Sequence, residues 1–113
     1  MAKQPKTQYL DVAELVELLG TSPGKIHRML EQKQLAAIRV DGVLKVPALF
    51  LLDNEPLPAL QGTLMLLNDA GYSIDEAVAW LFDEQAGLDV APIEALRSGR
   101  KSEVRRTAQS LAF

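Results

Sequence analysis

Two cations spaced three residues apart, Lys25 and Arg28, stand in a stretch that also contains Ser22 and His27. Residues three apart lie on the same side of a helix, so a helix here would present both positive charges together. Ammonium and guanidinium groups bind phosphate oxygens, and both also bind the base edge of guanine. A hydroxyl at a helix start, where Ser22 stands, suits a phosphate, and His27 could donate to a base edge. This stretch therefore predicts a surface that contacts a polyanion.

A second pair of cations, Arg39 and Lys45, flanks the dipeptide Asp41-Gly42. An Asp-Gly pair between runs of branched aliphatic residues is typical of a tight β-hairpin, because both central residues of a type I′ turn need positive φ. The hairpin would carry both cations on or beside its strands. It could lie along nucleic acid next to the preceding helix.

The sequence contains few residues whose types and spacing would suit catalysis or metal binding. The adjacent carboxylates Asp75 and Glu76, and likewise Asp83 and Glu84, diverge on a helix and lack an accompanying His or Cys. The chain has no cysteine and one histidine, His27, and no glycine-rich phosphate loop. We expect no enzyme activity, no metal site and no cofactor.

The positions of the polyanion-binding residues depend on two short helices and a turn. Asp11 and Glu14 form a capping box that starts the first helix, and Gly20 ends it. Ser22 and Pro23 start the second helix. We expect the first helix to brace the second through Leu15, Leu18 and Leu19 against Ile26 and Leu30.

Strands over 35–40 and 43–46 follow the second helix and form the hairpin. Helix, turn, helix and hairpin are the parts of a winged helix-turn-helix, whose second helix is narrow enough to enter the major groove of double-stranded DNA. The ordinary alternative is a solvated helix face beside a structural hairpin. We predict DNA contacts from Ser22, Lys25, His27, Arg28, Arg39 and Lys45.

The second half of the chain is predicted to be helical. A connector over 53–58 precedes helices over 59–70, 74–82 and 93–97 and a last helix capped by Ser102. The expected fold class is mainly α with a small β-hairpin wing. The expected organisation is an arm over 1–9, a winged helix-turn-helix over 10–52 and a helical C-terminal domain over 53–113.

The C-terminal helices carry more apolar surface than they can bury alone, so we expect them to dock on the winged helix or to self-associate. Trp80 and Phe82 are two residues apart and cannot point the same way on a helix. Either Trp80 packs in the core with Phe82 at its edge, or the pair marks a surface for a homodimer or a partner protein.

The net charge of −3 conceals an uneven distribution. Residues 1–52 carry +2, residues 53–96 carry −9 with no Lys or Arg, and residues 97–113 carry +4. Such polarity could orient the protein on a polyanion or simply maintain solubility. The basic run over 97–106 could contact phosphate or neutralise the acidic middle.

The composition, with 48% hydrophobic and 24% charged residues, is that of a globular domain. The absence of cysteine fits a reducing compartment. The apolar stretch over 46–52 is too short to span a bilayer, and no apolar region follows Lys3 and Lys6 as in a secretory signal. We expect a cytoplasmic location and no membrane partner.

The first half resembles the excisionase/MerR-type winged helix-turn-helix. The matching residues are Leu10-Asp11-Val12-Ala13-Glu14-Leu15, Leu18-Leu19-Gly20-Thr21-Ser22, Lys25-Ile26, Leu35-Ala36-Ala37 and Val46-Pro47. This head motif is shared by many proteins.

From about residue 9 to residue 113, the chain is similar to a small actinobacterial family of DNA-binding proteins known as substrates of a membrane Ser/Thr protein kinase. The tail matches are Leu57-Pro58, Leu66-Leu67-Asn68-Asp69-Ala70-Gly71-Tyr72, Trp80-Leu81-Phe82, Pro92-Ile93-Glu94-Ala95-Leu96 and Glu103-Val104-Arg105-Arg106-Thr107-Ala108-Gln109. The resemblance implies a winged-helix fold, DNA binding in transcription regulation and a phosphorylatable threonine in the N-terminal arm, where Thr7 is the candidate.

The tail also resembles the toxin-binding domain of Xre/ParS-type antitoxins, in its Trp-containing helix, Pro92-Ile93-Glu94-Ala95-Leu96 and Gly99. That resemblance implies a different function, namely a protein-interaction module whose DNA binding is autoregulatory.

Overall fold

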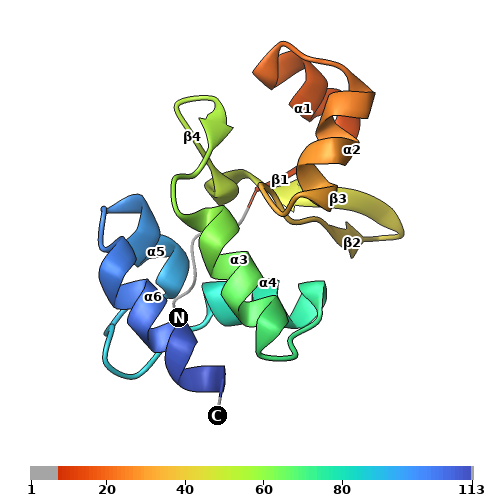
Figure 1. Ribbon diagram of the computed structural model, residues 1–113. Helices are drawn as coiled ribbons and strands as arrows, with labels where there is room; N and C mark the ends of the chain where they lie inside the picture. Colours follow the sequence, from red (N-terminus) through yellow and green to blue (C-terminus); the bar gives the residue numbers. More distant parts are fainter. Residues whose placement is uncertain (1–7, 113) are drawn as a thin grey trace.

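A three-stranded antiparallel sheet joins the N-terminal segment to the hairpin. The computed structural model describes residues 8–112, and in it β1 (Tyr9–Asp11), β3 (Val43–Pro47) and β2 (Ile38–Val40) pair in the order β1-β3-β2. Helices α1 (Val12–Leu19) and α2 (Pro23–Glu31) lie between β1 and β2 in the chain and form the top of the molecule in Figure 1. This arrangement confirms the winged helix-turn-helix.

Local capping fixes both ends of α1. The Glu14 amide donates to Asp11 Oδ1 at 2.8 Å, and the Asp11 amide donates to Glu14 Oε1 at 2.8 Å, which is the predicted capping box. Gly20 ends the helix with φ of 65°, a left-handed conformation that glycine adopts without steric cost. The turn then leads directly into α2.

The contact between α1 and α2 is built from fewer leucines than expected. Leu15 and Ile26 are completely buried, and Leu19 and Leu30 are partly buried against the same core. Leu18 instead is 42% exposed, so its predicted place in this contact is wrong. Leu19, four residues after Leu15, lies on the same side of α1 as Leu15. Leu18, three residues after Leu15, does not.

The hairpin turn has the predicted geometry. Asp41 and Gly42 have φ of 54° and 80°, so both central residues are left-handed as a type I′ turn requires. The first strand is shorter than predicted, because residues 35–37 approach it without pairing. Leu35 and Ala36 are buried there, so their apolar character reflects packing and not strand pairing.

Strand β1 was not expected from the sequence, since a three-residue strand has too few positions to show alternation. Tyr9 pairs with Pro47, and the Ala48 amide donates to the Gln8 carbonyl oxygen at 2.8 Å. The last residue of the range expected as an arm, Tyr9, therefore belongs to the sheet.

A second, smaller hairpin spans the start of the predicted connector. A turn of 3-10 helix, η1 (Ala48–Phe50), leads to β4 (Leu51–Leu52), which pairs with β5 (Glu55–Pro56). Asp53 and Asn54 form the turn with φ of 54° and 62°. Both residue types tolerate the left-handed region, which permits a tight turn without glycine.

Four helices and a terminal 3-10 turn complete the chain: α3 (Leu60–Asp69), α4 (Ile74–Phe82), α5 (Pro92–Arg97), α6 (Lys101–Gln109) and η2 (Ser110–Ala112). The predicted capping box at Ser73 is confirmed, with the Glu76 amide donating to Ser73 Oγ at 3.1 Å. The predicted cap at Ser102 is wrong. Helix α6 begins at Lys101, so Ser102 lies within its first turn, and Arg100 precedes the helix without a side-chain cap.

A single hydrophobic core joins the two halves. Phe50, which is fully buried, stacks at a tilt against Phe82 of α4 with ring centroids 5.7 Å apart. Trp80 is 7% exposed and Phe82 is partly buried, which is the packing expected if Trp80 belongs to the core. Docking on the winged helix thus covers the apolar sides of the C-terminal helices.

None of the helices in residues 8–112 is long and apolar enough to cross a membrane.

Candidate nucleic-acid interface

The cations of α2 are exposed on the side away from the core. Ile26 and Met29 are buried, whereas Lys25, His27 and Arg28 are all exposed. Successive residues are about 100° apart around a helix, which places Lys25 and Arg28 about 60° apart and His27 about 160° from Lys25. The structure therefore brings Lys25 and Arg28 together and leaves His27 on the opposite flank.

Ser22 is both a helix cap and a free donor. Its Oγ accepts a hydrogen bond from the Lys25 amide at 3.2 Å, and the side chain is exposed. A serine hydroxyl that accepts one bond still carries its own hydrogen, which can be donated to an anion. Pro23, in the first turn, has no amide hydrogen to satisfy. The start of α2 can thus accept a phosphate without losing its cap.

One carboxylate interrupts the positive surface. Glu31 is exposed at the end of α2, one turn after Arg28 and about 60° from it around the helix. Within residues 8–112, no ion pair joins these two side chains. The carboxylate of Glu31 therefore lowers the positive potential on the outer side of α2 without being neutralised by Arg28.

Arg39 is committed in part to the hairpin itself. Its Nη1 donates to the carbonyl oxygen of Gly42 at 3.1 Å, so the guanidinium folds over the turn. The side chain remains exposed and keeps further N–H donors. Arg39 can thus stiffen the wing and contact an anion at its tip.

Lys45 is not at the tip of the wing. It lies in the central strand β3, opposite Ile38 of β2 and Asp11 of β1, and it is partly buried. Because two strands flank it, its ammonium group reaches solvent from one sheet face and not from the hairpin end. The structure thus separates Lys45 from Arg39.

The basic run near the C-terminus divides into structural and surface residues. Arg97 donates to the carbonyl oxygen of Leu49 at 2.9 Å. Arg100 donates to both carboxylate oxygens of Glu103, at 3.1 and 2.8 Å, and to the carbonyl oxygen of Leu88 at 3.1 Å. The hydrogen bonds between Arg100 and Glu103 raise the pKa of Arg100 and lower the pKa of Glu103. The exposed cations of the run are Lys101, Arg105 and Arg106.

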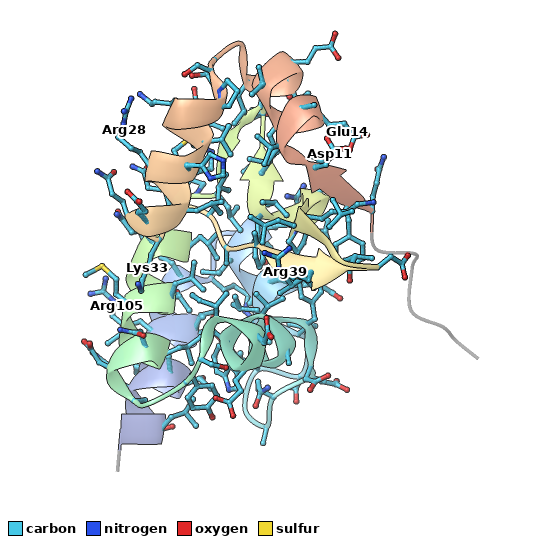
Figure 2. All side chains as sticks on the ribbon, turned by 90° about the vertical axis from the view of Figure 1, so that its right-hand side faces the viewer. Asp11, Glu14, Arg28, Lys33, Arg39 and Arg105 are labelled. Atoms are coloured by element: carbon cyan, nitrogen blue, oxygen red, sulfur yellow. The ribbon has the colours of Figure 1, made fainter. Side chains whose placement is uncertain are left out.

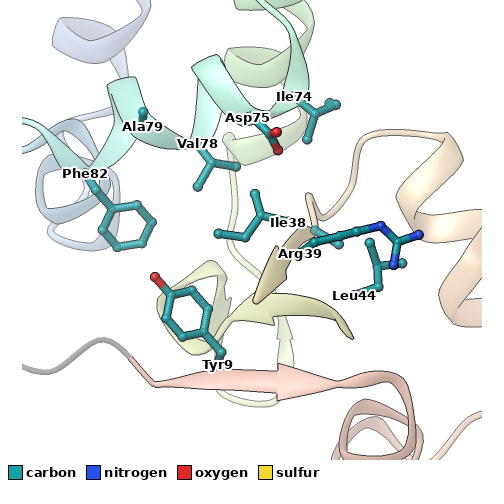
Figure 3. A pocket seen from close by; sticks show the side chains of 10 residues that line it. Tyr9, Ile38, Arg39, Leu44, Ile74, Asp75, Val78, Ala79 and Phe82 are labelled. Atoms are coloured by element: carbon teal, nitrogen blue, oxygen red, sulfur yellow. The ribbon is translucent and has the colours of Figure 1, made fainter. Parts of the chain in front are cut away.

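A cleft of about 690 Å³ lies between the sheet and α4, and no residue of α2 lines it (Figure 3). Its lining is mostly apolar and includes Tyr9, Ile38 and Phe82, with the charged Arg39 and Asp75 among the remaining residues. No group of three or more His, Asp or Glu side chains within residues 8–112 could hold a metal ion. Because no residue of α2 lines the cleft, the cleft is separate from the surface that carries Lys25 and Arg28.

Lys33 was not among the predicted contacts. It follows α2 by two residues with φ of 64° and is partly buried. Figure 2 shows Lys33 along the same edge of the molecule as Arg28 of α2 and Arg105 of α6. In the sequence, only its position two residues after the end of α2 could have indicated that Lys33 lies near Arg28.

Thr7, the candidate phosphorylation site, lies outside the described residues.

Two family models match the chain side by side. Residues 3–51 match the winged helix-turn-helix domain of the DNA-binding protein Rv2175c, and residues 57–112 match the Rv2175c C-terminal domain of unknown function. The DNA-binding protein Rv2175c of Mycobacterium tuberculosis is 29% identical over 96% of this chain and 84% of its own length. The NMR structure of Rv2175c superimposes with a TM-score of 0.87 at 28% identity, covering all of this chain and 86% of that one.

Both halves match in the same order, and together the matches span nearly the whole sequence. The chain therefore belongs to the Rv2175c family, in which a winged helix-turn-helix is joined to a helical C-terminal domain.

Proposed function

We propose that this protein binds double-stranded DNA through α2 and the β2–β3 wing and acts as a transcriptional regulator. The observation that carries the proposal is the pair of exposed cations, Lys25 and Arg28, on a helix whose inner side is buried at Ile26 in the same core as Leu15 of α1. The family match supports it, because the relative bears the name of a DNA-binding protein.

In this proposal α2 lies in the major groove. Lys25 and Arg28 contact phosphate or guanine, and Ser22 donates to a phosphate at the helix start. His27 reaches a base edge from the other flank of α2. Arg39 at the wing tip and Lys45 on the sheet contact the adjacent backbone.

The test is a salt-titrated binding assay with the double variant Lys25→Ala/Arg28→Ala. We expect weaker binding to duplex DNA and a dependence of log K on log salt that is flatter by about one to two units, since each lost phosphate contact removes about 0.9. The matched control is Asn54→Asp/Ala86→Glu, which changes net charge by the same two units at exposed positions outside α2 and the wing. Wild-type binding by the double variant at every salt concentration would reject α2 as the contact.

The protein is proposed to act by binding and not by catalysis. The carboxylate of Glu76 is used in the Ser73 capping box, where the Ser73 amide donates to Glu76 Oε1 at 2.9 Å, and this bond lowers the pKa of Glu76. Binding to chromosomal DNA agrees with the cytoplasmic location expected from the cysteine-free sequence.

Thr7 is proposed as a phosphorylation site for a Ser/Thr protein kinase. A phosphate adds close to two negative charges to a protein proposed to bind a polyanion, which should weaken binding. Thr7→Glu should therefore raise the Kd for DNA relative to Thr7→Gln, which has a similar shape and no charge. Equal affinities of the two variants would reject this switch.

The family match favours DNA binding over the antitoxin-like alternative, because the matched winged helix-turn-helix model and the relative both bear the name of a DNA-binding protein. The proposed homodimer or partner contact through these helices is tested by mass measurement of the DNA complex. Two copies per duplex would support the homodimer, and a copurifying second chain would support a partner protein.

A further inference from the structure

The surface of α6 carries cations that the fold itself does not use. We propose that Lys101, Arg105 and Arg106 form a second phosphate-binding surface, the α6 surface, which contacts the backbone of the same duplex that α2 binds. This inference rests on the proposed function and assigns a role to the C-terminal half of the chain.

The three side chains are exposed, and within residues 8–112 none of them takes part in a side-chain hydrogen bond or an ion pair. They line one depression together with Ala59, Thr63 and Ser102, and no carboxylate lines it. Three ammonium or guanidinium groups around a carboxylate-free depression favour an anion with several oxygen atoms.

The α6 surface is connected to the end of α2 through α3. Gln61 of α3 donates from Nε2 to the carbonyl oxygen of Gln32 at 2.8 Å, which ties α3 to the residue after α2. Gly62 lies beside Arg105, since a Cβ built on Gly62 would be 3.9 Å from Arg105 Nη2. Figure 2 shows Arg28, Lys33 and Arg105 along one edge as seen from that direction, and Figure 1 shows α3 between α2 and α6. A duplex lying along this edge would meet both cationic groups.

Helix α3 adds one negative charge to this edge, where Asp69 lines a depression together with Glu31 and Lys33. Its exposed residues before the last one are the uncharged Gln61, Met65 and Asn68, and its one acid is Asp69 at the end. By contrast, Glu84, Asp89 and Glu94 line a separate depression that contains no Lys or Arg. The protein is acidic overall, yet these three acids lie apart from the depression lined by Lys101, Arg105 and Arg106, and the acid of α6 itself, Glu103, is bound to Arg100.

Two helix starts add to the positive potential at the α6 surface. Ala59 precedes α3 and Arg100 precedes α6, and neither helix has a side-chain cap at its first turn. Unsatisfied amides at a helix start carry a partial positive charge and donate to anions. They reinforce the three cations.

The dimensions allow both surfaces to contact one duplex. The longest dimension of the protein is 38 Å, which is close to the ~34 Å length of one turn of B-form DNA. Phosphates met by α2 and by α6 would then lie within about 11 base pairs, at ~3.4 Å per base pair. A shorter duplex would lose the α6 contact first.

The test is the double variant Arg105→Gln/Arg106→Gln in the full chain, assayed by fluorescence anisotropy on one duplex at several salt concentrations. We expect the slope of log K against log salt to fall by about one to two units and Kd at low salt to rise about tenfold. The control Asn54→Asp/Ala86→Glu lowers net charge equally at exposed positions outside the α6 surface and should change the slope much less. Arg105→Lys/Arg106→Lys keeps both charges and should retain the wild-type slope.

Duplex length provides a second measurement. Wild-type affinity should fall as the duplex is shortened below about 11 base pairs, and the Arg105→Gln/Arg106→Gln variant should lose less affinity over the same range. The α6 surface is rejected if this variant binds with the wild-type slope while Lys25→Ala/Arg28→Ala loses affinity. It is also rejected if the control changes the slope as much as the variant does. If Lys25→Ala/Arg28→Ala binds as the wild type does, the proposed function itself fails.

Discussion

Arg97, in the last turn of α5, donates from Nη1 to the carbonyl oxygen of Leu49, 48 residues earlier in the chain, at 2.9 Å. The same nitrogen also donates to the carbonyl oxygen of Leu51. One guanidinium therefore satisfies two backbone groups in the segment that leaves the wing. It fixes the C-terminal helices against the winged helix, so this residue of the basic run stabilises the fold.

Arg97→Gln should destabilise the protein by about 1.5–3 kcal/mol, because hydrogen bonds from a charged group are lost and partly buried carbonyl oxygens lose their donor. Urea denaturation followed by circular dichroism measures the change. The control Arg106→Gln removes the same charge from an exposed side chain and should alter stability by no more than about 0.5 kcal/mol. Equal losses in the two variants would contradict the structural role of Arg97.

Glu31→Gln should strengthen DNA binding, because it removes a carboxylate that repels phosphates from the outer side of α2. We expect a severalfold lower Kd at low salt and a smaller difference at high salt, where charges are screened. Glu94→Gln changes net charge equally but lies on α5, and it should leave Kd nearly unchanged. A larger gain from Glu94→Gln than from Glu31→Gln would place the DNA elsewhere.

Two leucines of α1 should differ sharply in their contribution to stability. Leu15 is completely buried against α2, so Leu15→Ala should cost about 2–5 kcal/mol through lost burial and a residual cavity. Leu18 is 42% exposed, so Leu18→Ala should cost much less. Thermal denaturation of the two variants compares them directly, and similar losses would contradict the observed orientation of α1.

Acid should weaken the contact between Arg100 and Glu103. The hydrogen bonds from Arg100 hold the pKa of Glu103 below its ordinary value. The ionised carboxylate is therefore more favourable in the folded state than in the unfolded state. This stabilisation is present above the unfolded pKa and disappears as pH falls through the folded pKa.

Glu103→Gln should therefore lower Tm at pH 7, and the difference from the wild type should shrink as the pH falls below about 4, the range of an ordinary glutamate. Differential scanning calorimetry at several pH values measures it. Glu94→Gln, at an exposed position without a side-chain hydrogen bond among the described residues, should lower Tm less at pH 7. A Tm difference for Glu103→Gln that stays constant with pH would contradict this account.

The sequence by itself determined the features that depend on neighbouring residues. The Asp11–Glu14 and Ser73–Glu76 capping boxes, the end of α1 at Gly20 and the Asp41-Gly42 turn are all local, because each joins groups at most four residues apart. These signals placed α1, α2 and the wing, and with them the positions of Lys25 and Arg28.

Tertiary structure decided which groups meet across the chain. Strand β1 is defined by its partner β3, which lies more than thirty residues away, and its own three residues carry no pattern. Arg97, Arg100, Arg105 and Arg106 are the same residue type in one basic run, yet the first two bond to carbonyl and carboxylate groups and the last two remain exposed. Local sequence sets where a helix begins and ends. Only the packing of the helices decides whether a side chain bonds to a carbonyl oxygen of another segment or remains exposed to solvent.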